Sequence, residues 1–224
     1  MSAHEIDLGA IDPSGAIAEA AHRVSRRGFL AGAAGAAAVA AGLPAGALGQ
    51  DGKKTDIEIL NFALTLEYLQ AAFYSEAERL KALGALAAGA AKKIGAVERA
   101  HVTALQRALG PAATLGPLFD FQGTTEDDEA FLRTAVAFED LGTAAYKQQL
   151  TRISTPAYIS AAASIHSVEA RHAAWIRFIA GAQPAAAALD DPIADSDAAQ
   201  LVAGTGFTRP RPRTTARTPP SFTG

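Results

Sequence analysis

Residues 97–105 read VERAHVTAL and residues 168–176 read VEARHAAWI, so one chain carries the pattern Val-Glu-x-x-His twice. In each copy the polar pair lies in a stretch whose apolar residues recur at helical spacing. Side chains three positions apart lie on the same face of a helix, about one turn from each other. The two stretches therefore predict two helices that each present a carboxylate and an imidazole from one face.

Four helices are predicted, and local signals mark their ends. Thr55 and Glu58 have the spacing of a capping box, and Gly110-Pro111 combines a flexible residue with one that cannot donate a hydrogen bond. Thr155-Pro156 is an N-cap followed by the proline that is favoured at the first helical position. The stretch between the second and third helices lacks periodicity and is long enough to cross the length of a bundle. The predicted helices span residues 55–83, 86–110, 125–152 and 155–180.

The two halves of this region are similar to each other. Residues 67–74, EYLQAAFY, and residues 139–146, EDLGTAAY, share Glu, Leu, Ala and Tyr at the same four offsets. A Val-Glu-x-x-His segment follows each of them at a closely similar distance. An internal duplication of a helical hairpin is the economical interpretation. The predicted fold is all-α, an antiparallel four-helix bundle built from two similar hairpins that are joined by a long crossover.

Polar residues interrupt the apolar stripe of every predicted helix at one central level. Helical spacing directs them to the interior, where an unpaired carboxylate costs on the order of several kcal/mol. No lysine or arginine lies on these stripes near the glutamates, whereas two divalent cations would balance four carboxylates. The chain has no cysteine, and oxygen and imidazole ligands suit iron or manganese, with zinc as an alternative. A hydrogen-bonded polar layer without metal is the other interpretation. The predicted metal ligands are Glu67, Glu98, His101, Glu139, Glu169 and His172.

The order Glu, Glu-x-x-His, Glu, Glu-x-x-His on four successive helices resembles the ferritin-like di-iron and di-manganese carboxylate proteins. The resemblance covers about residues 55–181 and implies a ferritin-like bundle in which the six residues above hold two divalent ions, iron or manganese. The alanine-rich bundle, the N-terminal segment around Arg26 and Arg27 and a tail of the form Asp-Pro-Ile…Gly-Phe look most like the bacterial ferritin-like proteins that are grouped with plant desiccation-related proteins.

Four residues near the predicted ligands are candidates for supporting roles. Tyr74 is similar to a tyrosine that bacterioferritin and rubrerythrin carry two turns after the first glutamate, and we expect it and Tyr146 to donate hydrogen bonds or to pack in the core. His166 lies one turn before Glu169 and is a candidate substitute ligand or proton relay. Asp140 either orients a ligand histidine or is solvated.

Departures from these relatives narrow the expected chemistry. Arg99 stands where bacterioferritin has its haem-ligating methionine, so no haem is expected. Gly142 replaces an additional glutamate of rubrerythrin-like proteins, and the chain has no cysteine-rich module for electron delivery, which argues against rubrerythrin-type peroxidase activity. Gly142 is instead expected to leave room for a small oxidant. The long Pro-rich tail replaces the short fifth helix of cage-forming ferritins, which argues against a hollow iron store.

The first fifty residues resemble a twin-arginine export signal. Arg26 and Arg27 are followed by Phe and Leu, a weakly hydrophobic run and then the small residues PAGA at 44–47. The run is shorter than the roughly 20 apolar residues that span a bilayer, which disfavours a membrane anchor. We expect cleavage after Ala47 or Gly49, the twin-arginine translocase as a partner, and the periplasm or cell envelope as the destination.

The chain is thus divided into three segments. Residues 1–49 are the predicted signal peptide, residues 50–181 the four-helix bundle and residues 182–224 a Pro-rich tail. One short helix is a candidate after Asp195, but the end of the tail, RPRPRTTARTPPSFTG, is basic, rich in proline and poor in large apolar residues. We expect the tail to be largely disordered.

Composition and the predicted site together set the expected function. The net charge is -3 and basic residues do not gather with aromatic ones, so nucleic acid is not an expected partner. Our first hypothesis is a di-metal oxidoreductase that reacts with O₂ or H₂O₂, ferroxidase-like or catalase-like, in oxidative or desiccation stress. The alternatives are a non-enzymatic stress protein with a structural metal site and a metal-sequestering protein. A homo-oligomer is compatible with all three.

Overall fold

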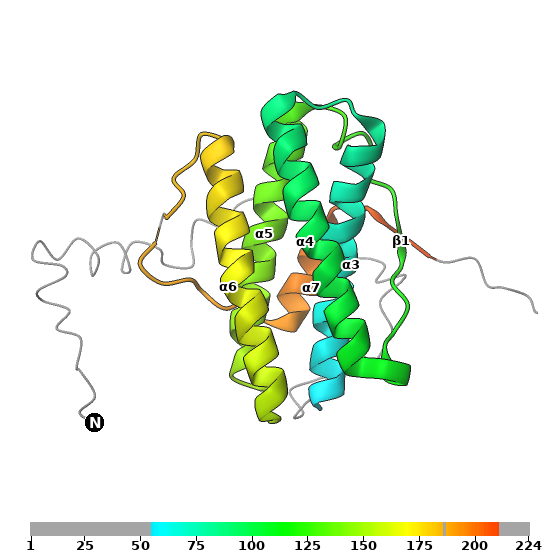
Figure 1. Cartoon of the computed structure of the whole chain (residues 1–224), viewed down its shortest axis with the longest axis vertical. Helices are drawn as coiled ribbons and strands as arrows, with labels where there is room; N and C mark the ends of the chain where they lie inside the picture. Colours follow the sequence, from blue (N-terminus) through cyan, green and yellow to red (C-terminus); the bar gives the residue numbers. More distant parts are fainter. Residues whose placement is uncertain (1–54, 186, 211–224) are drawn as a thin grey trace, which may run out of the picture.

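The computed structural model describes residues 55–185 and 187–210. Within this part, four long helices lie side by side as a bundle: α3 (Asp56–Leu80), α4 (Ala85–Leu109), α5 (Asp128–Leu150) and α6 (Pro156–Ile179) (Figure 1). α3 packs mainly along α4, and α5 mainly along α6. The crossover between the two hairpins contains a short 3-10 helix η2 (Gly110–Ala112) and strand β1 (Leu118–Phe119). The predicted all-α bundle of two helical hairpins is confirmed.

The first helix begins at its predicted cap and ends slightly early. The backbone N–H of Thr55 donates to Oε2 of Glu58 at 2.7 Å, and the N–H of Glu58 donates back to Oγ1 of Thr55 at 3.3 Å. The helix ends at Leu80 rather than near residue 83, because Lys81 adopts a left-handed conformation with φ of 56°. The bounds of α4 and α6 agree with the sequence prediction to within one residue.

The third helix begins three residues later than predicted. Asp127 is its N-cap, and its carboxylate accepts from the N–H of Ala130 at 2.9 Å. Thr125, the predicted start, is buried instead and donates its hydroxyl to Oε1 of Glu76 at 2.8 Å. A carboxylate is a better acceptor for the free N–H groups of a first turn than a hydroxyl that is already engaged elsewhere.

Two apolar clusters fill the bundle on either side of a polar layer. Along α3, Ile59 and Leu64 belong to one cluster and Phe73 to the other, with Glu67 between them. Phe73 stacks on Phe131 with 5.1 Å between ring centroids and has further aromatic neighbours edge to face. Close packing on both sides fixes the four helices in register at the level of the polar layer.

The segment after α6 folds back onto the bundle. Helix α7 (Asp195–Gly204) packs against α5 and buries Ala198 and Val202 in the core, and Figure 1 shows it crossing behind the long helices. Strand β2 (Thr208–Arg209) pairs antiparallel with β1 of the crossover. The helix predicted after Asp195 is therefore present.

The expectation of a largely disordered tail is wrong for residues 193–209. Phe207 is buried and meets Phe121 and Phe138 with ring centroids 5.4 Å and 6.3 Å away. Arg209 donates to Oδ2 of Asp120 at 3.0 Å. A few well-placed apolar residues thus order a stretch whose average composition is poor in large side chains.

Other sequence predictions fall outside the described residues. They are the signal peptide with Arg26 and Arg27, its cleavage positions at Ala47 and Gly49, and the end of the tail from residue 211 onward. Among the helices of the described part, none combines the length and the apolar character needed to cross a bilayer.

Candidate metal centre

Six polar side chains from the four bundle helices meet in one buried layer. The four glutamates are 0% exposed, and the two histidines are 8% and 7% exposed. α3 and α5 each supply one glutamate, whereas α4 and α6 each supply a Glu-x-x-His pair. The structure thus brings together all six residues that the sequence singles out: Glu67, Glu98, His101, Glu139, Glu169 and His172.

The donor atoms of these residues form two overlapping groups. Each group contains four residues, whose donor atoms lie within 4.8 Å of one another. Glu98 and Glu169 belong to both groups. One further glutamate and one histidine complete each group, Glu67 with His101 in the first and Glu139 with His172 in the second. This is the arrangement expected for two ions that share two carboxylates and have one glutamate and one histidine each.

The same ring nitrogen of each histidine faces the carboxylates. Nδ1 of His101 lies 3.2 Å from Oε2 of Glu98 and 3.3 Å from Oε2 of Glu67. It also lies 3.1 Å from Oε1 of Glu169. Nδ1 of His172 lies 2.7 Å from Oε1 of Glu98. Both imidazoles therefore aim one nitrogen into the space that the carboxylates enclose.

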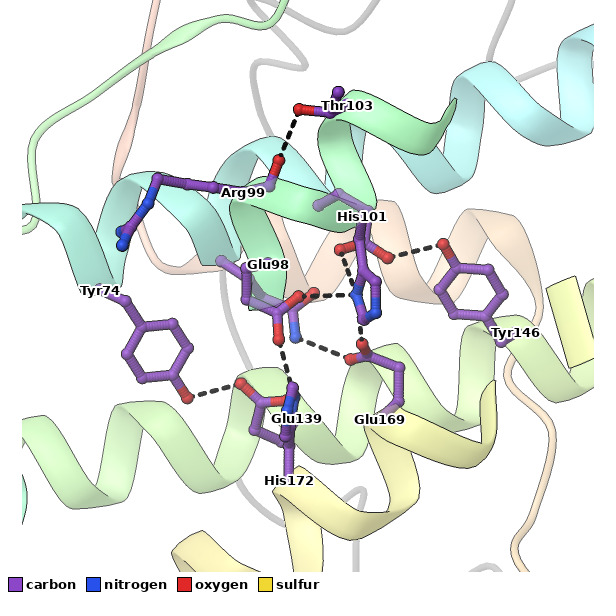
Figure 2. A network of polar contacts seen from close by, with 11 residues as sticks. Tyr74, Glu98, Arg99, His101, Thr103, Glu139, Tyr146, Glu169 and His172 are labelled. Atoms are coloured by element: carbon purple, nitrogen blue, oxygen red, sulfur yellow. Dashed lines mark hydrogen bonds and ion pairs between the residues drawn. The ribbon is translucent and has the colours of Figure 1, made fainter. Parts of the chain in front are cut away.

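Two tyrosines hold glutamates of the opposite hairpin. The hydroxyl of Tyr74, on α3, donates to Oε1 of Glu139, on α5, at 2.5 Å. The hydroxyl of Tyr146, on α5, donates to Oε1 of Glu67, on α3, at 2.6 Å. Figure 2 shows the two tyrosines approaching the cluster from opposite sides. The duplication seen in the sequence is therefore a duplication of the hydrogen bonds around the site.

Each of the four glutamates has one carboxyl oxygen that makes no hydrogen bond within the described residues. These oxygens are Oε2 of Glu67, Oε1 of Glu98, Oε2 of Glu139 and Oε1 of Glu169. Each of these oxygens lies 2.7–3.5 Å from Nδ1 of His101 or His172, without hydrogen-bond geometry, so four buried carboxylates converge on two imidazoles. A buried carboxylate needs a compensating charge. Four such oxygens beside two imidazole nitrogens are a donor set that a pair of divalent cations satisfies. The residues present therefore fit a dinuclear site.

Burial and mutual contacts shift the pKa values of the cluster in opposite directions. Burial alone would raise the pKa of Glu98, but contacts with His101 and His172 lower it to about 2. Burial raises the pKa of Glu139 to about 8, against the effect of its contact with His172. Burial alone would lower the pKa of His101, but contacts with Glu169 and two other glutamates raise it to about 12. Contacts with Glu139 and Glu98 likewise outweigh burial and raise the pKa of His172 to about 10. Both imidazoles are therefore protonated near neutral pH when no metal is bound.

Metal binding is expected to release protons and to strengthen as the pH rises. An ion can occupy Nδ1 of His101 or His172 only after the proton has left, so the loaded form holds fewer protons than the metal-free form. Between pH 6 and 8 the apparent affinity should rise by about tenfold per pH unit for each proton released. Calorimetric titration with Mn²⁺ in buffers of different ionisation enthalpy counts these protons. An affinity that does not change over this pH range would contradict the assignment of the two histidines.

The comparison with known protein families agrees with this geometry. A sequence model described as the ferritin-like domain matches residues 55–182, which is more than half of the chain. The chain belongs to the ferritin-like domain family. A search of curated proteins finds no match. The matched region contains the four bundle helices and all six residues of the cluster, whereas α7 and β2 follow after it.

Two of the predicted supporting residues of this ferritin-like domain are not among the candidate metal ligands. Asp140 orients no histidine: its partly exposed carboxylate forms a two-point contact with the guanidinium of Arg177 at 2.9 Å and 2.6 Å. His166 is half-buried on α6, and its Nδ1 makes no hydrogen bond within the described residues. Neither residue belongs to the two groups of candidate ligands.

The room that was expected at Gly142 is filled. A Cβ atom at this position would lie 2.6 Å from Oε2 of Glu169 and 3.2 Å from Nε2 of Gln70. Gln70 is buried and donates to Oε2 of Glu169 at 3.1 Å, a role that the sequence analysis missed. The signal was available, because Gln70 and Gly142 occupy equivalent positions in the two halves and are one of the four pairs that differ between residues 67–74 and 139–146.

Proposed function

We propose that this ferritin-like domain holds a pair of iron or manganese ions and reacts with O₂ or H₂O₂. The observation that carries the proposal is the layer of four fully buried carboxylates whose inner oxygens converge on the Nδ1 atoms of two imidazoles. Four carboxylates neutralise two divalent ions, so the ions would enter the interior without net charge. Hard oxygen donors and imidazole, without sulfur, favour these metals over softer ones.

The surrounding residues would orient the ligands and exclude water. Tyr74 and Tyr146 bind the outer oxygens of the unshared glutamates, which directs the inner oxygens toward the ions. The apolar clusters on both sides of the layer limit the access of bulk water. The bound ions would supply the change between divalent and trivalent states that a reaction with O₂ or H₂O₂ requires.

Metal content and oxidant consumption test this proposal. Protein loaded with Fe²⁺ or Mn²⁺ without oxygen should bind two ions and consume O₂ or H₂O₂ at least about tenfold faster than the free ions do. Ferroxidase-like chemistry consumes O₂ as Fe²⁺ is oxidised, whereas catalase-like chemistry releases O₂ from H₂O₂. Asp140→Asn is the matched control, since Asp140 is next to Glu139 but pairs with Arg177. Two bound ions with no consumption of either oxidant would contradict the enzymatic part.

A structural role for the metal pair is the second candidate function. It is favoured by the enclosure of the cluster, because the groove of about 390 Å³ outside α3 and α4 is lined by none of the six residues. Its lining includes Tyr68, Arg99 and Val102, which face the crossover. In a stress protein of this kind, loss of metal would lower the melting temperature, and oxidant consumption would be absent from the loaded protein.

We also propose export through the twin-arginine route to the periplasm or cell envelope, with a role in oxidative or desiccation stress. The support is the sequence around Arg26 and Arg27, followed by a weakly hydrophobic run. Replacing both arginines with lysine should leave the full chain in the cytoplasm, whereas Arg23→Lys should not affect export. Fractionation of cells that express the full chain measures this. Equal export of all three chains would contradict the proposal.

A further inference from the structure

Gln70 and Gly142 occupy equivalent positions in the two halves and differ beside the metal layer. The glutamates, histidines and tyrosines of the two halves match, but Gln70 follows Glu67 by three residues where Gly142 follows Glu139. Gln70 is 2% exposed, and its Nε2 donates to Oε2 of Glu169. A glycine at the equivalent position has no side chain with which to donate to Glu98. The two carboxylates shared by both groups therefore have different surroundings.

The shared carboxylates also differ in orientation. Oε1 of Glu98 lies 2.7 Å from Nδ1 of His172, and Oε2 lies 3.2 Å from Nδ1 of His101, so both oxygens face the cluster. Glu169 directs only Oε1 toward the cluster, at 3.1 Å from Nδ1 of His101. Its Oε2 points to the amide of Gln70. Glu98 thus presents two oxygens to the shared space and Glu169 presents one.

Gly142 provides the space that this orientation needs. The 2.6 Å between its ideal Cβ position and Oε2 of Glu169 is shorter than any ordinary contact. A methyl group at residue 142 would therefore force the outer oxygen of Glu169 to move. Gln70 attracts this oxygen and Gly142 makes room for it, so the two residues act on the same atom from two helices.

We infer that Gln70 and Gly142 are positioning residues that turn one oxygen of Glu169 away from the metal pair and so keep one metal position free for a small anionic or peroxide-like ligand. The part that concerns the ligand rests on the proposed dinuclear site. A carboxylate that bridges with both oxygens fills one position on each ion, whereas one that binds a single ion through one oxygen leaves a position open on the other ion. Gln70 and Gly142 would then decide on which side of the layer a small ligand binds.

Two variants and a matched control separate positioning from general stability. Gln70→Leu keeps the approximate size of the side chain and removes the donor, and Gly142→Ala fills the space from the other helix. Thr143→Val is the control, because Thr143 is buried at the same level of α5 and its hydroxyl makes no hydrogen bond within the described residues. In crystals of the metal-free proteins, Oε2 of Glu169 should turn toward the cluster in both variants and stay in place in the control.

Azide binding to the Co²⁺-loaded proteins then tests the free position. Co²⁺ should bind with unchanged stoichiometry in all four proteins, and absorption spectra should show azide binding to the wild type and the control. In Gln70→Leu and Gly142→Ala the azide affinity should fall by at least about tenfold, since the second oxygen of Glu169 would take the position. If one variant fails to fold, the other still provides the test, because they act on the same oxygen from different helices.

The outcomes distinguish this inference from the proposed function. If Glu169 keeps its orientation in both variants, the inference is wrong and the metal site is unaffected. If Glu169 turns but azide affinity is unchanged, the assignment of the free position is wrong. If the wild-type protein binds no Co²⁺, Mn²⁺ or Fe²⁺ while Glu169 still turns in the variants, the proposed function fails and the positioning role stands.

Discussion

Replacing Glu98 with glutamine is expected to abolish the binding of both metal ions, whereas Glu67→Gln should weaken only one. Glu98 belongs to both groups of candidate ligands and Glu67 to the first alone. Glutamine keeps the size of the side chain but removes the charge that offsets the ions. Breaking a buried ionic contact costs about 3–5 kcal/mol, which corresponds to a loss of roughly 100-fold to several-thousand-fold in affinity.

Calorimetric titration with Mn²⁺ measures this contrast. The wild type should bind two ions, Glu67→Gln one ion with near-native affinity, and Glu98→Gln none at micromolar protein. Asp140→Asn is again the control, and circular dichroism should show that all variants keep their helices. Equal loss of binding in the Glu67 and Glu98 variants would show that Glu98 is not shared, and full retention by Glu98→Gln would remove it from the site.

Removal of both metal ions is expected to lower the free energy of unfolding substantially. An ion that binds only the folded chain stabilises it by about 2.7 kcal/mol when its free concentration is 100 times the dissociation constant, so two ions contribute about 5 kcal/mol under that condition. Without ions, the four buried glutamates must be neutralised by protons and by the protonated His101 and His172. We therefore expect the chelated protein to unfold at a clearly lower denaturant concentration.

The dependence of the free energy of unfolding on the free metal concentration is a more specific measurement than the comparison with chelated protein. Each tenfold increase in free Mn²⁺ should add about 1.4 kcal/mol per ion to the free energy of unfolding, or roughly 2.7 kcal/mol for the pair. Urea titrations in metal buffers give this slope. Glu98→Gln should show a slope near zero. A zero slope in the wild type would mean that the polar layer holds no ion in the native state.

The six candidate ligands could be predicted because the spacing within short segments of the sequence identifies each of them. Glu98 and His101, like Glu169 and His172, lie on one helix face by their spacing alone, and the repeated segments at 67–74 and 139–146 align the remaining two glutamates. The helix starts at Thr55 and at Thr155-Pro156 were also visible, since the residues involved are neighbours in the chain. Local spacing is thus sufficient when the bundle has only one way to bury its polar residues.

Contacts between distant segments were harder to predict. The sequence left Asp140 open between orienting a histidine and being solvated, because its partner, Arg177, lies on another helix whose rotation the sequence does not state. The reciprocal partners of Tyr74 and Tyr146 depend on the register between α3 and α5. Phe207 anchors the segment after the bundle through the aromatic cluster at Phe121, which average composition does not reveal. In each case the sequence does not specify which residues of distant segments lie close together in the fold.

The crossed tyrosine contacts bear on how such a chain could arise. Neither hairpin contains a complete site, because the first group of ligands borrows Glu169 and the second borrows Glu98. A single hairpin of this kind would need a second copy of itself, which would donate the tyrosine hydrogen bond to its glutamate and supply the fourth ligand for an ion. Joining two such hairpins in one chain makes that encounter independent of protein concentration, and it lets equivalent positions carry different residues, as Gln70 and Gly142 do, which identical subunits could not.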